Sequence, residues 1–158
     1  SKEAWVQRTG PGANNIISSD GTAFWAPDSG NVLASGHTNS WFYVQDSIAL
    51  PTNSWQYVAV TYDPIAAGGT MILYRNGLQV ASGTAKGIHT LGATTWIGSH
   101  NNGSWFSGQI DEARISSSVR SSNWLWACYL NQGTNRSAFF TCSPVTRFGH
   151  RGMLWIVR

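Results

Sequence analysis

Apolar and polar residues alternate along most of this chain in short runs that end at turn-forming residues. The first run, Glu3 to Arg8, stops at Thr9-Gly10-Pro11-Gly12. Similar runs cover residues 15–18, 22–25, 41–44, 55–62, 71–75, 78–81, 94–98 and 110–115. A period of two predicts β-strands, and about nine short strands with no interleaved helices predict an antiparallel sandwich or barrel.

Two local signals refine this prediction. Asn76-Gly77 lies between two apolar runs and predicts a tight hairpin, because both turn residues need positive φ. Only Ser121 to Leu130 has helical spacing. We expect Asn123 to cap this helix, and Trp124, Leu125 and Cys128 to face inward.

Charge is sparse and unevenly placed. Charged residues make up 11% of the chain, against about 25% in ordinary soluble domains. Residues 1–142 hold seven basic and seven acidic side chains, so the net charge of +3 comes from Arg147, Arg151 and Arg158. The body has no basic stripe, so the sequence gives no support for nucleic-acid binding. It has no run of about 18 apolar residues either, so we expect no membrane insertion.

Ser143-Pro144 separates a domain over residues 1–142 from a basic tail over residues 143–158. The tail is either one further strand around residues 153–157 or sequence foreign to the domain. The chain begins at Ser1 without a leader, and its many Ser, Thr, Asn and Gly residues are typical of extracellular proteins. We therefore expect a mature or excised piece of a secreted or cell-surface protein, a monomer tethered to other modules.

Several motifs occur in the order and spacing of one family. They are Glu3-Ala4-Trp5-Val6, Asn53 to Asp63, Leu73-Tyr74-Arg75-Asn76-Gly77, and Phe106 to Ile115 with its Ile-Asp-Glu-Ala-Arg-Ile ending. Together they resemble laminin G-like domains of the concanavalin A-like lectin/glucanase superfamily. The resemblance covers roughly residues 3–142 and implies a jelly-roll sandwich of two antiparallel sheets with one short helix near the C-terminus. It also implies a module that binds glycans or proteins, and in many members a structural calcium ion.

Asp111 is the candidate calcium ligand. Ala113 and Ile115 share its face by the period of two, and the resemblance implies that this face packs inward. An inward carboxylate either ligates calcium together with loop carbonyls or accepts backbone hydrogen bonds without a metal. Cys128 and Cys142 are expected to form a disulfide if the domain is secreted, and the alternative is two reduced thiols.

Catalysis has little support in the sequence. Glucanases on this fold carry a Glu-x-Asp-x-x-Glu strand, whereas this chain has two glutamates, Glu3 and Glu112. Asp111 and Glu112 are adjacent, so on a strand they would point to opposite faces and could not form a catalytic pair. The four histidines show no metal-ligand spacing.

The nine tryptophans provide the candidate binding residues. Aromatic rings match the apolar face of a sugar, and amide or imidazole groups match its hydroxyls. Trp5, Trp55 and Trp96 sit in the recognisable strands and are expected to be structural. The remaining candidates form a polar loop and a strand face: Trp105 with His100, Asn101 and Asn102, and Trp41 with Tyr43, Gln45 and Trp25.

Three functions follow from the sequence, in decreasing order of support. The first is a non-catalytic carbohydrate-binding module, lectin-like, for a polysaccharide or oligosaccharide. The second is an adhesion module that binds a protein. The third is a glycoside hydrolase of the glucanase type.

Overall fold

The computed structural model describes residues 1–27, 30–37, 42–84 and 94–133. Its strands are β1 (Lys2–Arg8), β2 (Ile17–Ser19), β3 (Thr22–Trp25), β4 (Val32–His37), β5 (Phe42–Ala49), β6 (Trp55–Asp63), β7 (Thr70–Arg75), β8 (Leu78–Thr84), β9 (Thr95–Ile97) and β10 (Gly108–Ile115). The helices are a 3-10 turn, η1 (Ala66–Gly68), and α1 (Ser122–Gln132). The predicted residues Trp41 and Cys142 lie outside the described ranges.

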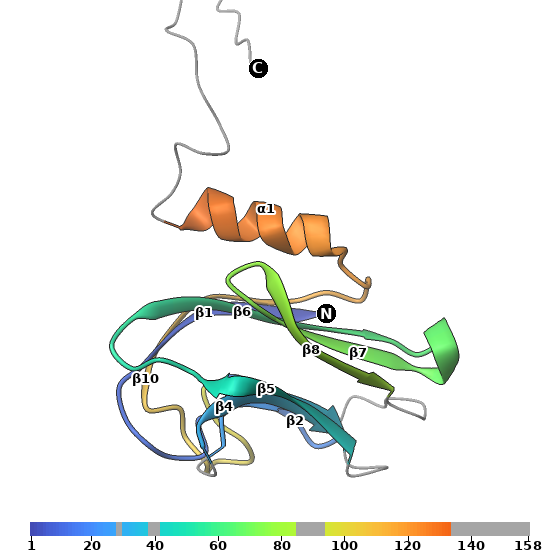
Figure 1. Cartoon of the computed structure of the whole chain (residues 1–158). Helices are drawn as coiled ribbons and strands as arrows, with labels where there is room; N and C mark the ends of the chain where they lie inside the picture. Colours follow the sequence, from blue (N-terminus) through green and yellow to red (C-terminus); the bar gives the residue numbers. More distant parts are fainter. Residues whose placement is uncertain (28–29, 38–41, 85–93, 134–158) are drawn as a thin grey trace, which may run out of the picture.

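The strands form two antiparallel five-stranded sheets that pack face to face (Figure 1). Sheet A has the order β10-β1-β6-β7-β8 and sheet B the order β5-β4-β3-β2-β9. Alternate side chains from both sheets fill the space between them, as the period of two predicts. This core contains Ala4, Val6, Ile16, Ile17, Phe24, Ala26, Leu33, Val44, Leu50, Val58, Val60, Met71 and Leu73. The predicted jelly-roll sandwich is therefore confirmed.

The hairpin prediction is also confirmed. Asn76 and Gly77 have φ values of 52° and 78°, and they join Arg75 of β7 to Leu78 of β8. One strand was missed: β4 has the small residues Ala34, Ser35 and Gly36 at its centre, which give no visible alternation. Its place is set by β3 and β5, which pair with it from both sides.

Helix α1 lies over the outer face of sheet A (Figure 1). Leu125 is fully buried, as expected, against Tyr57, Ala59 and Tyr74 of the sheet. At the other end of the helix, Trp5 Nε1 donates to Gln132 Oε1 at 2.9 Å. The aromatic side chains of sheet A thus hold the helix in place.

Two details of the helix differ from the prediction. Ser121, not Asn123, is the N-cap: its side chain accepts the Trp124 N–H, because Asn123 already lies within the first turn. Trp124 does not face inward. It is 46% exposed, with the Arg120 guanidinium 4.4 Å from its ring centroid. Neighbouring helix residues point about 100° apart, so a helix that packs Leu125 and Tyr129 against the sheet turns Trp124 away from it.

Candidate functional site

Trp105 stands on a tightly closed loop between β9 and β10. His100 and Gly103 exchange two backbone hydrogen bonds of 2.9 Å. Asn101, Asn102 and Ser104 all take positive φ, between 48° and 56°. Such values cost free energy in residues other than glycine, and clusters of them often occur at functional sites.

The loop is fastened to its neighbours by asparagine side chains. Asn15 Nδ2 donates to the Ser104 carbonyl at 3.1 Å, and Ser107 N–H donates to Asn14 Oδ1 at 2.8 Å. Trp105, between these two anchors, is 63% exposed. The Trp105 ring is therefore presented to solvent from a backbone that is fixed on both sides.

The outer face of sheet B forms a second candidate surface. Tyr43 is 54% exposed and Gln45 is exposed, whereas Val44 between them is in the core, so the predicted alternation along β5 is confirmed for these residues. Trp25 belongs to the same face, because Phe24 beside it points into the core.

Small residues separate the aromatic rings on this face. Register pairs Tyr43 with Gly36 of β4 and Gly36 with Ala23 of β3; one step along, it pairs Gln45 with Ala34 and Ala34 with Trp25. The face is thus a floor of Ala23, Ala34 and Gly36 with larger side chains around it. We call Tyr43, Gln45, Trp25 and this floor the sheet B face. In Figure 1, α1 covers the outer face of sheet A, and no described helix covers the sheet B face.

The structure separates the predicted residues into two surfaces. Tyr43 and Gln45 lie on β5, at one edge of sheet B, and the Trp105 loop follows β9, at the other edge. Four strand spacings of about 4.8 Å put these edges roughly 19 Å apart. Trp96 of β9 pairs with Ser18, which alternates with the core residue Ile17, so Trp96 lies on the outer side of sheet B at the β9 edge. It is half-buried and meets His100 edge-on, with ring centroids 5.5 Å apart.

Asp111 does not face inward. Its side chain is exposed, and one carboxylate oxygen accepts the N–H of Glu112 at 2.8 Å. Glu112 has a φ of 51°, and the pairing of β1 with β10 shifts at this point, from Glu3–Arg114 to Trp5–Asp111. This bulge breaks the period of two, so the face of Ala113 is not the face of Asp111.

The described residues do not bring together the several acidic side chains that are common in calcium sites. They contain no group of three or more His, Cys, Asp or Glu side chains that could hold a metal ion. The acidic neighbour of Asp111, Glu112, is paired with Arg114, and one exposed carboxylate is a poor start for a site that needs six to eight oxygens. Calcium binding by the whole chain stays a prediction.

The two glutamates meet at one arginine on the sheet A side. Glu3 is 5% exposed, accepts a hydrogen bond from the Tyr57 hydroxyl and lies 3.9 Å from Arg114 Nη1. Arg114 also forms a close ion pair with Glu112. Burial, then the hydrogen bond to Glu3, raises the pKa of Tyr57 far above its usual 10.0, so the phenol stays a donor. The sequence analysis missed this cluster, because its members are brought together by pairing of distant strands.

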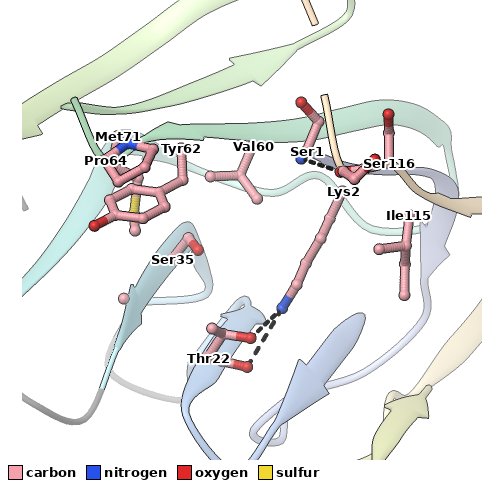
Figure 2. Close-up of a pocket in the computed structure, with 12 residues that line it drawn as sticks. Ser1, Lys2, Thr22, Ser35, Val60, Tyr62, Pro64, Met71, Ile115 and Ser116 are labelled. Atoms are coloured by element: carbon pink, nitrogen blue, oxygen red, sulfur yellow. Dashed lines mark hydrogen bonds between the residues drawn. The ribbon is translucent and has the colours of Figure 1, made fainter. Parts of the chain in front are cut away.

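A cavity of about 290 Å³ opens between the sheets at the start of β1. Figure 2 shows Lys2 crossing it from sheet A, with Val60, Tyr62 and Met71 on one wall. Lys2 Nζ donates to Thr22 Oγ1 at 2.6 Å and to the Ile17 carbonyl at 3.0 Å. Burial lowers the pKa of Lys2 to about 7. The sequence analysis missed this residue. The available signal was that Lys2 alternates with Ala4 and Val6, which both face the core.

Cys128 of the expected disulfide lies on α1, half-buried against the aromatic cluster under the helix. Burial is the main cause that raises the pKa of its thiol. Because Cys142 is outside the described residues, the disulfide stays a prediction.

The chain folds as a two-sheet jelly roll whose helix covers one sheet face and not the other. Exposed aromatic and amide side chains lie on the side without the helix. Together these features define a lectin-like β-sandwich module. A family model of the concanavalin A-like lectin/glucanase superfamily, of the laminin G type, matches residues 1–125. The chain belongs to this family. No curated protein matches it significantly. No helix in the described part of the chain is long and apolar enough to cross a membrane.

Solved structures share the fold at low sequence identity. A Bacteroides ovatus protein provisionally named as carbohydrate-binding is 24% identical, with a TM-score of 0.67 over 79% of this chain; the match spans only 39% of that protein. Domain 4 of an extracellular arabinanase from Geobacillus stearothermophilus, in complex with arabinotriose, is 20% identical over 79% of this chain and 63% of its own, with a TM-score of 0.60. The CBM40 domain of a Ruminococcus gnavus sialidase, bound to α2,3-sialyllactose, is 13% identical over 81% of this chain and 80% of its own, with a TM-score of 0.64.

Proposed function

We propose that this chain is a non-catalytic carbohydrate-binding module that holds a polysaccharide or oligosaccharide on the sheet B face. One observation carries the proposal: Tyr43 is 54% exposed on the one sheet face that α1 does not cover, with Gln45 and Trp25 on the same face. An aromatic ring can stack on the C–H face of a sugar, and the Gln45 amide can bond to its hydroxyls.

The relatives support this proposal. Arabinotriose and sialyllactose are the ligands of two neighbours on the same fold. We propose by the same reasoning that the module works outside the cell, at the surface or secreted, attached to a larger protein. A single site of this kind binds weakly, and attachment to further modules would raise its avidity.

Non-catalytic binding is favoured over glucanase activity by the state of the two glutamates. Both are engaged by Arg114 on the sheet A side, and Glu3 is buried beneath α1. Neither carboxylate is on the sheet B face. Release of reducing sugar that is abolished by Glu112→Gln would contradict this part of the proposal.

Affinity electrophoresis through gels that contain soluble polysaccharides tests the main proposal. Retardation on at least one polysaccharide is expected, and Tyr43→Ala should weaken it at least tenfold. Trp124→Ala is the matched control, since it also removes an exposed aromatic ring, but from α1 on the opposite side. Equal loss in both variants, or retardation on no glycan, would contradict the proposal, and the latter would favour a protein-binding adhesion module.

Trp105→Ala decides between the two surfaces in the same gels. Because the Trp105 loop is at the opposite edge of sheet B, this variant should lose less than threefold if the sheet B face alone holds the ligand. A larger loss with Trp105→Ala than with Tyr43→Ala would move the site to the loop.

Calcium is tested separately by thermal melting with and without a chelator. A bound ion at about 100 times its Kd would contribute about 2.7 kcal/mol, which shifts the midpoint by several degrees. An unchanged midpoint would contradict calcium binding.

A further inference from the structure

Among the described residues, the sheet B face carries no formal charge. The strands β2, β3, β4, β5 and β9 contain a single charged residue, Asp46. Asp46 points away from this face: it is 3% exposed and lies 3.1 Å from Arg75 Nη1 of sheet A. The tight β2–β3 turn adds Asp20, which lies beyond the ends of the strands.

The other charged side chains of the described residues lie away from the sheet B face. Lys2 and Arg8 are 8% exposed, and both donate to backbone carbonyls inside the sandwich or its loops. Glu3, Glu112 and Arg114 form their cluster on sheet A, and Arg120 stacks on Trp124 of α1. Asp63 accepts two backbone N–H groups at η1. Six charged residues lie outside the described residues: Asp28, Lys86, Arg136, Arg147, Arg151 and Arg158.

A face of this kind discriminates strongly between ligand classes. An acidic sugar brings a carboxylate or sulfate that must leave water, and a carboxylate that loses its hydration without a cationic partner is penalised by several kcal/mol. Arginine or lysine normally supplies that partner, through short charge-assisted bonds. The sheet B face offers aromatic rings and one amide, which match the C–H faces and hydroxyls of a neutral sugar.

The spacing of the rings adds a length requirement. Tyr43 is on β5 and Trp25 on β3, with β4 between them. Two strand spacings place them at least about 10 Å apart across the sheet. One ligand reaches both rings only if it is an oligosaccharide or a polysaccharide segment rather than a single sugar.

We infer that the sheet B face binds uncharged glycan chains and rejects those that carry uronate, sialate or sulfate groups. This inference rests on the proposed function, because it names the ligand class of the same site. The selectivity follows from the lack of charged side chains on the outer face of the five strands. Tyr43 and Trp25 are the two aromatic contact residues, and Gln45 is the polar one.

The test compares neutral and acidic polysaccharides in one assay. Retardation is measured on arabinan, xylan and β-glucan, and on polygalacturonate, alginate and hyaluronan. Each measurement is made at low salt and at about 0.5 M NaCl, where the Debye length falls below about 5 Å. Binding to at least one neutral chain is expected, with less than a twofold change in affinity between the two salt concentrations.

The outcomes separate the two proposals. Binding to an acidic chain that exceeds binding to every neutral one, or that falls more than tenfold at high salt, overturns the inference and leaves carbohydrate binding standing. Retardation on neither set overturns both. Gln45→Lys provides a second readout: it should create weak, salt-sensitive binding to acidic chains and leave the melting temperature within a few degrees of the parent. Unchanged rejection of acidic chains by a folded Gln45→Lys variant would also overturn the inference.

Discussion

Lys2 of sheet A and Thr22 of sheet B form a polar link between the two sheets, with Nζ 2.6 Å from Oγ1 (Figure 2). The described partners of the amine are the hydroxyl and two backbone carbonyls, none of which carries a formal charge. The sheets are also joined near the β5 edge by Asp46 and Arg75, and there both partners are charged. The difference has consequences for how stability depends on pH.

The free energy of unfolding should rise between about pH 7 and pH 10 because of Lys2. Burial lowers the pKa of its amine to about 7 in the folded protein, against 10.5 when exposed. In this window the unfolded chain binds more protons than the folded one, so stability increases with pH, and the contribution is lowest below pH 7. Urea unfolding at several pH values measures it.

Lys2→Met is the matching control for this effect. The variant keeps the length of the side chain and loses the titration, so its stability should rise less steeply across the window. The Ser1 amino group titrates in both proteins: burial, then the charge of Lys2, lowers its pKa, so Lys2→Met removes the second cause and keeps the first. Parallel pH profiles for the two proteins would contradict the role given to Lys2.

Gly77→Ala should destabilise the protein by roughly 2–4 kcal/mol, measured by urea unfolding. Gly77 has a φ of 78°, and a Cβ at this position would lie 2.6 Å from Trp126 Cε3, so backbone strain and overpacking add together. Gly68→Ala separates the two causes: Gly68 has a similar φ of 76° but open space around it. Its cost should be about 1 kcal/mol, and equal costs would rule out the Trp126 contact.

Leu125→Ala should cost about 3 kcal/mol, because Leu125 is fully buried between α1 and sheet A. The exposed neighbour Trp124 offers a comparison: Trp124→Ala should cost about 1 kcal/mol or less. Thermal and urea unfolding of both variants measure the difference. Similar losses in the two would mean that α1 is not docked as described.

Tyr57→Phe should cost about 1–3 kcal/mol, since it removes a donor from the buried carboxylate of Glu3. Tyr43→Phe removes a hydroxyl from an exposed ring and should be close to neutral in stability. Unfolding curves for the pair give the comparison. A neutral Tyr57→Phe would show that Arg114 alone satisfies Glu3.

The candidate binding surfaces were partly predictable from sequence. Tyr43, Gln45 and Trp105 are exposed, as expected, because their polar flanks and the alternation along β5 are local properties. Their separation onto opposite edges of sheet B was not predictable, since strand order depends on which distant strands pair. Trp55, expected to be structural, is 40% exposed, whereas Trp5 holds the C-terminal end of α1 through Gln132.

Local sequence patterns were enough to predict most of the strands, the Asn76-Gly77 turn and the sandwich class, but not β4. Alternation and turn preference act over a few residues and depend little on the rest of the chain. Long-range packing set the direction of Asp111, the pairing of Glu3 with Tyr57 and the position of α1 over sheet A. The bulge at Glu112 shows the physical reason: one residue in a left-handed conformation reverses every face assigned beyond it, and only the pairing with β1 fixes where that residue lies.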